Sequence, residues 1–105
     1  MKIKTKFYGP KHHWKYVTYY LKNGKMVHHS IDDQPARVTQ DGGKQWMKDG
    51  VEHRDSGPSW EHPDGIYKCW HYNGEFLGCN DPCCTDKLVK SNEDFERWKK
   101  LLAFN

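Results

Sequence analysis

The cysteines are the residues whose type and spacing come closest to a metal site. Cys69 stands in a strand-like segment, and Cys79, Cys83 and Cys84 follow in a turn-rich one. Thiolates bind zinc tetrahedrally, and His62 or His71 is available to replace one of them. The spacing is poor, however, because no Cys-x-x-Cys pair exists and adjacent cysteines do not easily bind one ion. We therefore expect no cofactor and incidental cysteines, reduced rather than disulfide-bonded because the chain shows no secretory signal. Structural zinc is the alternative, with Cys69, Cys79, Cys83, Cys84 and His71 as its candidate ligands.

The seven histidines do not form a pattern of ligands or catalytic groups. His12-His13 and His28-His29 are adjacent pairs, and neighbours on a strand point to opposite faces, so they do not chelate one ion together. His53-Arg54 belongs to a repeated motif, which favours a structural role such as a hydrogen bond to a neighbouring turn. No Gly-x-Ser-x-Gly, His-Glu-x-x-His or phosphate-binding loop occurs. The sequence therefore predicts no catalytic residues, and a protein that is not an enzyme.

The composition indicates one folded domain whose core is more aromatic than aliphatic. The chain has 105 residues, 17 Lys and Arg against 14 Asp and Glu, and a net charge of +3. Ile, Leu and Val total 13, whereas Phe, Trp and Tyr total 15. Disorder would need a large net charge and few aromatic residues, and neither is present. No apolar run approaches the ~18 residues of a membrane-spanning helix, so we expect no membrane association.

A short motif occurs three times along the chain. An aromatic residue stands four positions before the glycine of an Asn-Gly or Asp-Gly pair, in Tyr20 to Gly24, Trp46 to Gly50 and Trp70 to Gly74. A two-residue hairpin turn of type I′ needs positive φ at both central positions, which these dipeptides tolerate best. Pro35 and Pro58 cannot donate to a strand ladder, so they belong at strand starts or edges. The sequence predicts a mainly β fold, an antiparallel meander of short hairpins with one hairpin per repeat.

The last segment changes to a helical period. Ser91 is placed to cap a helix, with Asp94 at the third helical position as a partial capping box. Phe95, Trp98 and Leu102 form an apolar stripe, which we expect to pack on the sheet. The predicted organisation is a single domain over 1–105: a basic and aromatic segment over 1–14, hairpin repeats over 15–77, a Cys-rich loop over 78–90 and a helix over 91–103.

The repeat resembles the short hairpin repeats of uncharacterised proteins from large tailed phages and giant viruses, which are similar to variant MORN repeats. The match covers roughly residues 15 to 102. The first copy departs from it, because His28-His29 stands where His-Arg is expected and Gln34 replaces a glycine. The resemblance implies a phage or viral protein that acts in the host cytoplasm, and it implies no known reaction. The residues that carry it are Trp46 to Gly50, His53-Arg54, Ser56-Gly57-Pro58, Asp64-Gly65, Trp70 to Gly74 and Glu93-Asp94-Phe95.

A compact scaffold with surplus aromatic residues and no catalytic set favours binding. Tyr and Trp are enriched among the residues that dominate protein interfaces. With the resemblance, this leads us to expect a phage accessory protein that binds and inhibits a host protein, in host takeover or as an inhibitor of host defence. Some of the candidate anchors must be core residues. These candidates are Trp14, Tyr20, Trp46, Trp60 and Trp70.

The alternative is a module that binds nucleic acids or nucleotides. Lysines alternate with aromatic residues near the N-terminus, a combination that attracts phosphates and stacks bases. The net charge of +3 is modest for such a protein, and acids occur throughout the later repeats. Self-association through exposed sheet edges is also open. The lysines of the nucleic-acid alternative are Lys2, Lys4, Lys6, Lys11 and Lys15.

Overall fold

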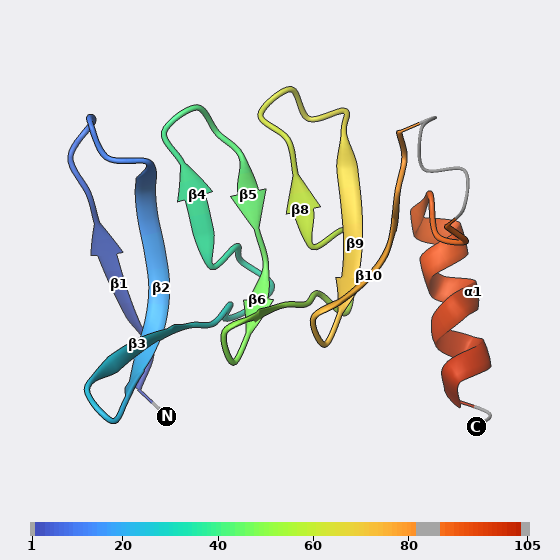
Figure 1. Ribbon diagram of the computed structural model, residues 1–105, viewed down its shortest axis with the longest axis horizontal. Helices are drawn as coiled ribbons and strands as arrows, with labels where there is room; N and C mark the ends of the chain where they lie inside the picture. Colours follow the sequence, from blue (N-terminus) through green and yellow to red (C-terminus); the bar gives the residue numbers. More distant parts are fainter. Residues whose placement is uncertain (1, 82–86, 104–105) are drawn as a thin grey trace.

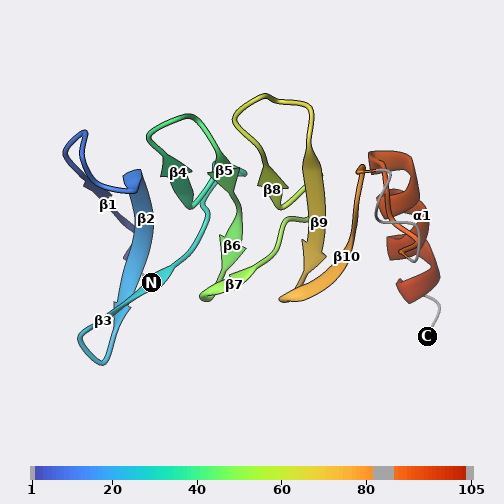
Figure 2. The same cartoon turned by 45° about the horizontal axis from the view of Figure 1, so that its top comes forward.

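The computed structural model describes residues 2–81 and 87–103 of the chain. Within them, strands pair antiparallel in every case, and one helix follows at the C-terminal end (Figures 1 and 2). This confirms the predicted mainly β fold with an antiparallel meander and one C-terminal helix. The elements are β1 (Lys4–Phe7), β2 (Trp14–Lys22), β3 (Lys25–His28), β4 (Arg37–Thr39), β5 (Lys44–Gln45), β6 (Met47–Lys48), β7 (Val51–Glu52), β8 (Trp60–Glu61), β9 (Lys68–Tyr72), β10 (Glu75–Cys79) and α1 (Asn92–Ala103).

The hairpins lie side by side in the order in which they occur along the chain (Figure 1). The main sheet has the order β1-β2-β4-β5-β8-β9-β10, with β3 also paired to β2, and β6 and β7 form a small sheet of their own. Pro35 and Pro58 stand just before β4 and β8, as predicted for strand starts. Strand β1 pairs with β2 over four positions. Lys4 to Phe7 of the basic and aromatic segment over 1–14 therefore belong to the sheet.

The three short turns have the predicted type I′ chemistry. Their first residues have φ values of 53° at Asn23, 49° at Asp49 and 50° at Asn73, and the glycine that follows each of them is also in the positive-φ region. Both central positions of each turn are thus left-handed, which matches the right-handed twist of the flanking strands. These turns lie at one end of the hairpins, and the longer loops between β1 and β2, β4 and β5, and β8 and β9 lie at the other (Figure 1).

The first repeat is longer than the turn motif suggests. The backbone amide of His53 donates to the carbonyl of Trp46 at 3.1 Å, and the amide of His29 donates to that of Thr18, also at 3.1 Å. Thr18 therefore occupies the place of Trp46 in the first repeat. Tyr20, which the turn motif aligned with Trp46, lies two residues further toward the turn.

Histidines and turn amides connect each repeat to the next. His29 Nδ1 accepts a hydrogen bond from the backbone amide of Asp49 at 3.0 Å, and His53 Nδ1 accepts one from the amide of Asn73 at 2.8 Å. This confirms the predicted hydrogen bond from a repeated histidine to a neighbouring turn. It also corrects the alignment of the first copy: the counterpart of His53 is His29 rather than His28, so Ser30 takes the place of Arg54.

Helix α1 covers the C-terminal end of the sheet. The cluster that it completes contains Trp70, Leu77, Val89 and Phe95. At the helix start Ser91 Oγ accepts from the amide of Asp94 at 3.1 Å, as predicted. The predicted apolar stripe ends at Trp98, because Leu102 is 45% exposed.

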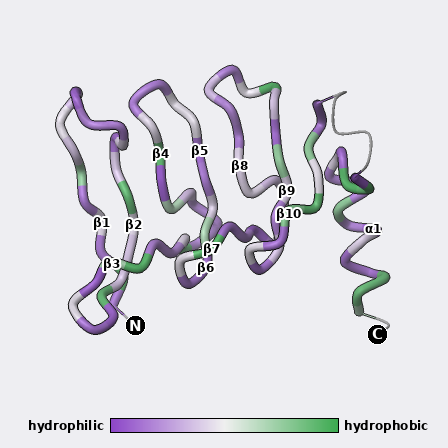
Figure 3. Tube along the Cα trace, viewed as in Figure 1, coloured by the Kyte–Doolittle hydropathy of each residue, from purple (hydrophilic) through white to green (hydrophobic). Residues whose placement is uncertain are grey.

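Strongly hydrophobic positions are sparse along the trace, and hydrophilic residues dominate the long loops (Figure 3). Three aromatic side chains of the described residues are buried beside four buried Val and Leu side chains, so the prediction of a core more aromatic than aliphatic is wrong. Among the described residues, no helix has the length and apolar character needed to cross a bilayer.

Candidate binding surface

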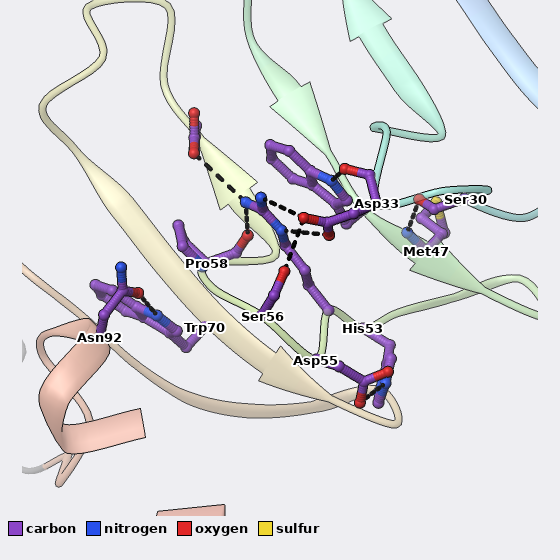
Figure 4. A network of polar contacts seen from close by, with 12 residues as sticks. Ser30, Asp33, Met47, His53, Asp55, Ser56, Pro58, Trp70 and Asn92 are labelled. Carbon is purple, nitrogen blue, oxygen red and sulfur yellow. Dashed lines mark hydrogen bonds and ion pairs between the residues drawn. The ribbon is translucent and has the colours of Figure 1, made fainter. Parts of the chain in front are cut away.

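Two of the five predicted anchors are core residues. Trp46 is 4% exposed and Trp70 is 2% exposed. Both indole N–H groups are also satisfied inside the protein, Trp46 Nε1 by the carbonyl of Asp33 at 2.9 Å and Trp70 Nε1 by Asn92 Oδ1 at 3.0 Å (Figure 4). The prediction that Trp46 and Trp70 contact a partner is therefore wrong, because Trp46 is buried under Arg54 and Trp70 is buried in the cluster with Phe95.

Tyr20 is half-buried and joins two hairpins near the short turns. Its hydroxyl donates to the carboxylate of Asp49 at 2.8 Å, and its ring contacts the ring of His29 edge-on, with 5.7 Å between centroids. The hydrogen bond to Asp49 raises the pKa of the Tyr20 phenol. Tyr20 thus has a structural partner of its own and lies apart from the two remaining anchors.

The remaining anchors, Trp14 and Trp60, are half-buried and belong to one surface. Arg37 pairs with Gln45 across β4 and β5, and Gln45 pairs with Trp60 across β5 and β8. Residues directly opposite each other in antiparallel strands project to the same side, so these three form a row. The Arg37 guanidinium lies 4.6 Å from the centre of the Trp14 ring. We call this region the Arg37–Trp60 surface and define it by Trp14, Arg37, Gln45, Trp60, His62 and Tyr67.

The rings at the β8 end of this surface support one another. Trp60 makes edge-on contacts with His62 and Tyr67, at centroid distances of 5.8 Å and 5.4 Å. These contacts fix the orientation of a partly exposed indole, which reduces the entropy that it would lose on binding. Sequence reasoning found Trp60 but missed its companions.

A hollow of about 480 Å³ lies beside Trp60, where the long loops meet. Each of the three long loops contributes to its wall, and strand residue Gln45 lines it as well. The loop contributions include His12 and His13 from the first hairpin, Gln40 and Asp41 from the second, and His62 and Pro63 from the third.

Carboxylates keep this hollow from being strongly basic. A hydrogen bond from Thr39 holds the pKa of Asp41 below its ordinary value. The backbone amides of Ile66 and Tyr67 lower the pKa of Asp64 in the same way. Both groups are therefore ionised at neutral pH, and His62 Nδ1 lies 3.4 Å from the Asp64 carboxylate. The local charge is mixed, unlike that of the N-terminal hairpin.

A second pocket, of about 410 Å³, surrounds Arg54. The guanidinium lies 3.8 Å from the centre of the Trp46 ring. Its Nε and Nη2 donate to the two carboxylate oxygens of Asp33 at 3.0 and 3.1 Å, and its Nη1 donates to the carbonyl of Pro58 at 3.1 Å (Figure 4). Glu61 lies 3.6 Å away, and the hydrogen bond from Arg54 lowers the pKa of Asp33. The N–H groups of Arg54 are thus occupied by hydrogen bonds that join its own repeat to the segment around Asp33.

The predicted zinc ligands are brought together only in part. Cys69 and Cys79 face each other across β9 and β10, but Cys69 is a buried free thiol and Cys79 is disulfide-bonded. The expectation of a reduced thiol is thus wrong for Cys79. His71 Nδ1 lies 2.7 Å from Ser59 Oγ. The described residues contain no group of three or more histidines, cysteines or carboxylates able to hold a metal ion. The other two candidate ligands, Cys83 and Cys84, lie outside the described residues.

The lysines of the nucleic-acid alternative form the basic end of the molecule. Residues 1–31 contain seven lysines and no Asp or Glu, so their charge of +7 leaves −4 for the rest of a chain with net charge +3. Lys4 and Lys6 project from β1, the edge strand of the sheet. Charged side chains of this kind are typical of edges that are protected against unwanted pairing. All five predicted lysines are exposed: Lys2, Lys4, Lys6, Lys11 and Lys15.

Comparison of the chain with models of protein families, with curated proteins and with solved structures finds no match in any of the three. The resemblance to phage and giant-virus hairpin repeats therefore stays a prediction that rests on the sequence motifs alone.

Proposed function

We propose that the protein is a non-enzymatic binding module that engages a partner protein through the Arg37–Trp60 surface. The observation that carries this proposal is the pair of half-buried indoles, Trp14 and Trp60, beside a hollow built from three hairpins. Tryptophan and arginine are enriched among the residues that dominate binding energy, and such residues lie in preformed depressions. In the setting that the resemblance implies, the partner is a host protein whose activity is inhibited in the host cytoplasm.

The scaffold is suited to this role because it holds the surface on paired strands. Arg37, Gln45 and Trp60 all belong to the sheet, and the hydrogen bonds that His29 and His53 accept from turn amides join each hairpin to the next. A site placed on paired strands is more precise than one placed on loops alone.

The proposal is tested by capturing proteins from a host lysate on the wild-type chain and on Trp60→Ala. Truncation of an interface anchor costs about 2 kcal/mol, so we expect roughly thirtyfold weaker binding of the protein that the wild type recovers in stoichiometric amounts. Phe76→Ala is the matched control, because Phe76 is a partly exposed ring on the edge strand β10, outside the Arg37–Trp60 surface. Equal recovery by Trp60→Ala, or no stoichiometric partner for the wild type, would contradict the proposal.

A second candidate function is binding of single-stranded nucleic acid, which the charge of +7 over residues 1–31 favours. In that case the affinity for oligothymidylate falls steeply as salt rises, since neutralised phosphates release counterions. Lys4→Gln with Lys6→Gln then makes the salt dependence shallower, by roughly 0.7 in log–log slope for each lost contact. A flat salt response of the wild type, or no binding at low salt, removes this candidate.

A further inference from the structure

Arg37 is a half-buried cation that lacks a counter-ion. Its Nη2 donates to Gln45 Oε1, and its guanidinium stacks on Trp14. None of the salt bridges in the described residues includes it. Its Nε is the only buried side-chain nitrogen or oxygen among the described residues without a hydrogen-bond partner. A charged group taken out of water in this way is costly unless an anion compensates it.

Arg54 shows how the same fold satisfies an equivalent group. Both guanidiniums stack on a tryptophan ring, Arg54 at 3.8 Å and Arg37 at 4.6 Å. Arg54 has the two oxygens of Asp33 in addition, whereas Arg37 has only an amide oxygen. The difference between the two sites is therefore the pair of carboxylates, Asp33 and Glu61, that contact Arg54 and have no counterpart at Arg37.

No carboxylate of the described residues forms an ion pair with the Arg37 guanidinium. Burial lowers the pKa of Arg37, and the charge of Glu52 opposes this effect through space. His28 faces the same guanidinium, and its pKa is lowered first by burial and then by repulsion from Arg37. His28 is thus a neutral neighbour at physiological pH. What the site lacks is an anion in contact with the guanidinium.

We propose that Arg37 and Gln45 bind the side-chain carboxylate of an acidic residue of the partner protein. Gln45 accepts from Arg37 through Oε1, so its Nε2 is left as a donor. Arg37 Nη1 has no hydrogen-bond partner among the described residues, and it is not among their buried unsatisfied atoms, so it is not fully buried. Two donors side by side match the two oxygens of a carboxylate. This inference rests on the proposed function, because it identifies the partner chemistry of the same surface.

The neighbouring charges favour a single carboxylate over a nucleic-acid backbone. Asp49 lines the same small pocket as Arg37, Glu52 acts on Arg37 through space, and Asp41 lines the hollow beside Gln45. A string of phosphates laid across this surface would meet those carboxylates, whereas one acidic side chain meets the two donors. The lysine-rich strand β1, separated from β4 by β2, is the more favourable place for a polyanion.

The test follows the guanidinium signals of the full chain by nitrogen-15 NMR. The chain has three arginines, and Arg37→Lys assigns the signal of interest by its loss. One probe is a blocked peptide, acetylated and amidated, with a single Glu among Gly and Ser; the matched probe carries Gln instead. We expect the Glu peptide to move the Arg37 signals with saturation at roughly millimolar concentration, while the Arg54 signals stay in place. The Gln peptide should bind about tenfold more weakly or not at all.

Three results would overturn the inference: no movement with the Glu peptide, equal movement of Arg37 and Arg54, or movement of Arg37 with oligothymidylate alone. Its failure is distinguishable from failure of the proposed function. If Trp60→Ala abolishes partner capture while the Arg37 signals ignore the Glu peptide, the binding function stands and the carboxylate site is wrong. If Arg37 responds to Glu but capture does not depend on Trp60, the site stands and the proposed function is wrong.

Discussion

Replacing Phe95 by alanine is expected to lower the free energy of unfolding by about 3–5 kcal/mol, the usual cost of removing a buried aromatic ring. Phe95 is completely buried. Its ring stacks on Trp98 and makes a tilted contact with Tyr72, both at a centroid distance of 6.3 Å. It is the one fully inserted side chain of α1. The substitution therefore weakens the packing of α1, the helix that covers the last hairpin.

The position of α1 makes this effect larger than in an ordinary surface helix. Arrays of stacked repeats need a terminal element that covers the apolar side of the last repeat. Without the helix, Trp70, Leu77 and Val89 would lose their common cover. Since small domains are stable by only about 5–15 kcal/mol, the variant should be close to unfolding at moderate temperature.

Urea unfolding followed by tryptophan fluorescence measures the Phe95→Ala effect. Leu101→Ala is the matched control, because Leu101 lies on the same helix and is 63% exposed. Its expected cost is below about 0.5 kcal/mol. A Phe95→Ala variant within about 1 kcal/mol of the wild type would mean that the helix does not seal the core.

The second large effect is expected for Arg54→Met, at about 2–4 kcal/mol. The methionine keeps much of the contact with the Trp46 ring but leaves the Asp33 carboxylate without its bidentate partner. Hydrogen bonds to charged groups contribute about 1.5–3 kcal/mol, and Arg54 is only 16% exposed on its side chain. Thermal unfolding should show the loss as a decrease in Tm of roughly 10–20 °C. Arg97→Met is the control, because the Arg97 side chain is 69% exposed and its ion pair with Asp94 is worth little.

The Arg54 effect should depend on pH. Because Arg54 lowers the pKa of Asp33 below its ordinary value of 3.8, folding favours the ionised carboxylate. The stability from this pair is present above the unfolded pKa and is lost as pH falls through the folded one. The difference between wild type and Arg54→Met should thus shrink as pH is lowered below about 4. A difference that stays constant down to pH 2 would exclude the ion pair as its cause.

Local features of the fold were predictable because short-range chemistry determines them. Asn23, Asp49 and Asn73 start type I′ turns since the dipeptide at each place tolerates positive φ, whatever the rest of the chain does. The helix start is equally local, with Ser91 three residues before Asp94. The bond between the second and third repeats followed from the recurrence of His53 in the motif, whereas in the first copy the motif pointed to His28 instead of His29.

The alignment of the first repeat and the presence of strand β1 were not predicted, because both depend on pairing between strands. Thr18 takes the place of Trp46 because the first hairpin is longer, and counting back from its turn leads to Tyr20 instead. Strand β1 has all four residues exposed, so it lacks the alternation that marks a half-buried strand.

The binding surface was predictable only in part. Trp14 and Trp60 were among the predicted anchors, but no spacing distinguishes an exposed indole from a buried one such as Trp46. Arg37 and Gln45 were missed, because their contact depends on the register between β4 and β5, which the sequence motif does not give. Their position beside Trp14 depends in turn on the pairing of β4 with β2.

The most direct test of the account is amide hydrogen exchange of the chain in complex with the protein that it captures. Partner binding at the Arg37–Trp60 surface predicts slower exchange over residues 37–45 and 60–67, with the helix over 92–103 unchanged. Protection confined to the helix or to the short turns, with the amides of 37–45 and 60–67 exchanging as in the free chain, would contradict it.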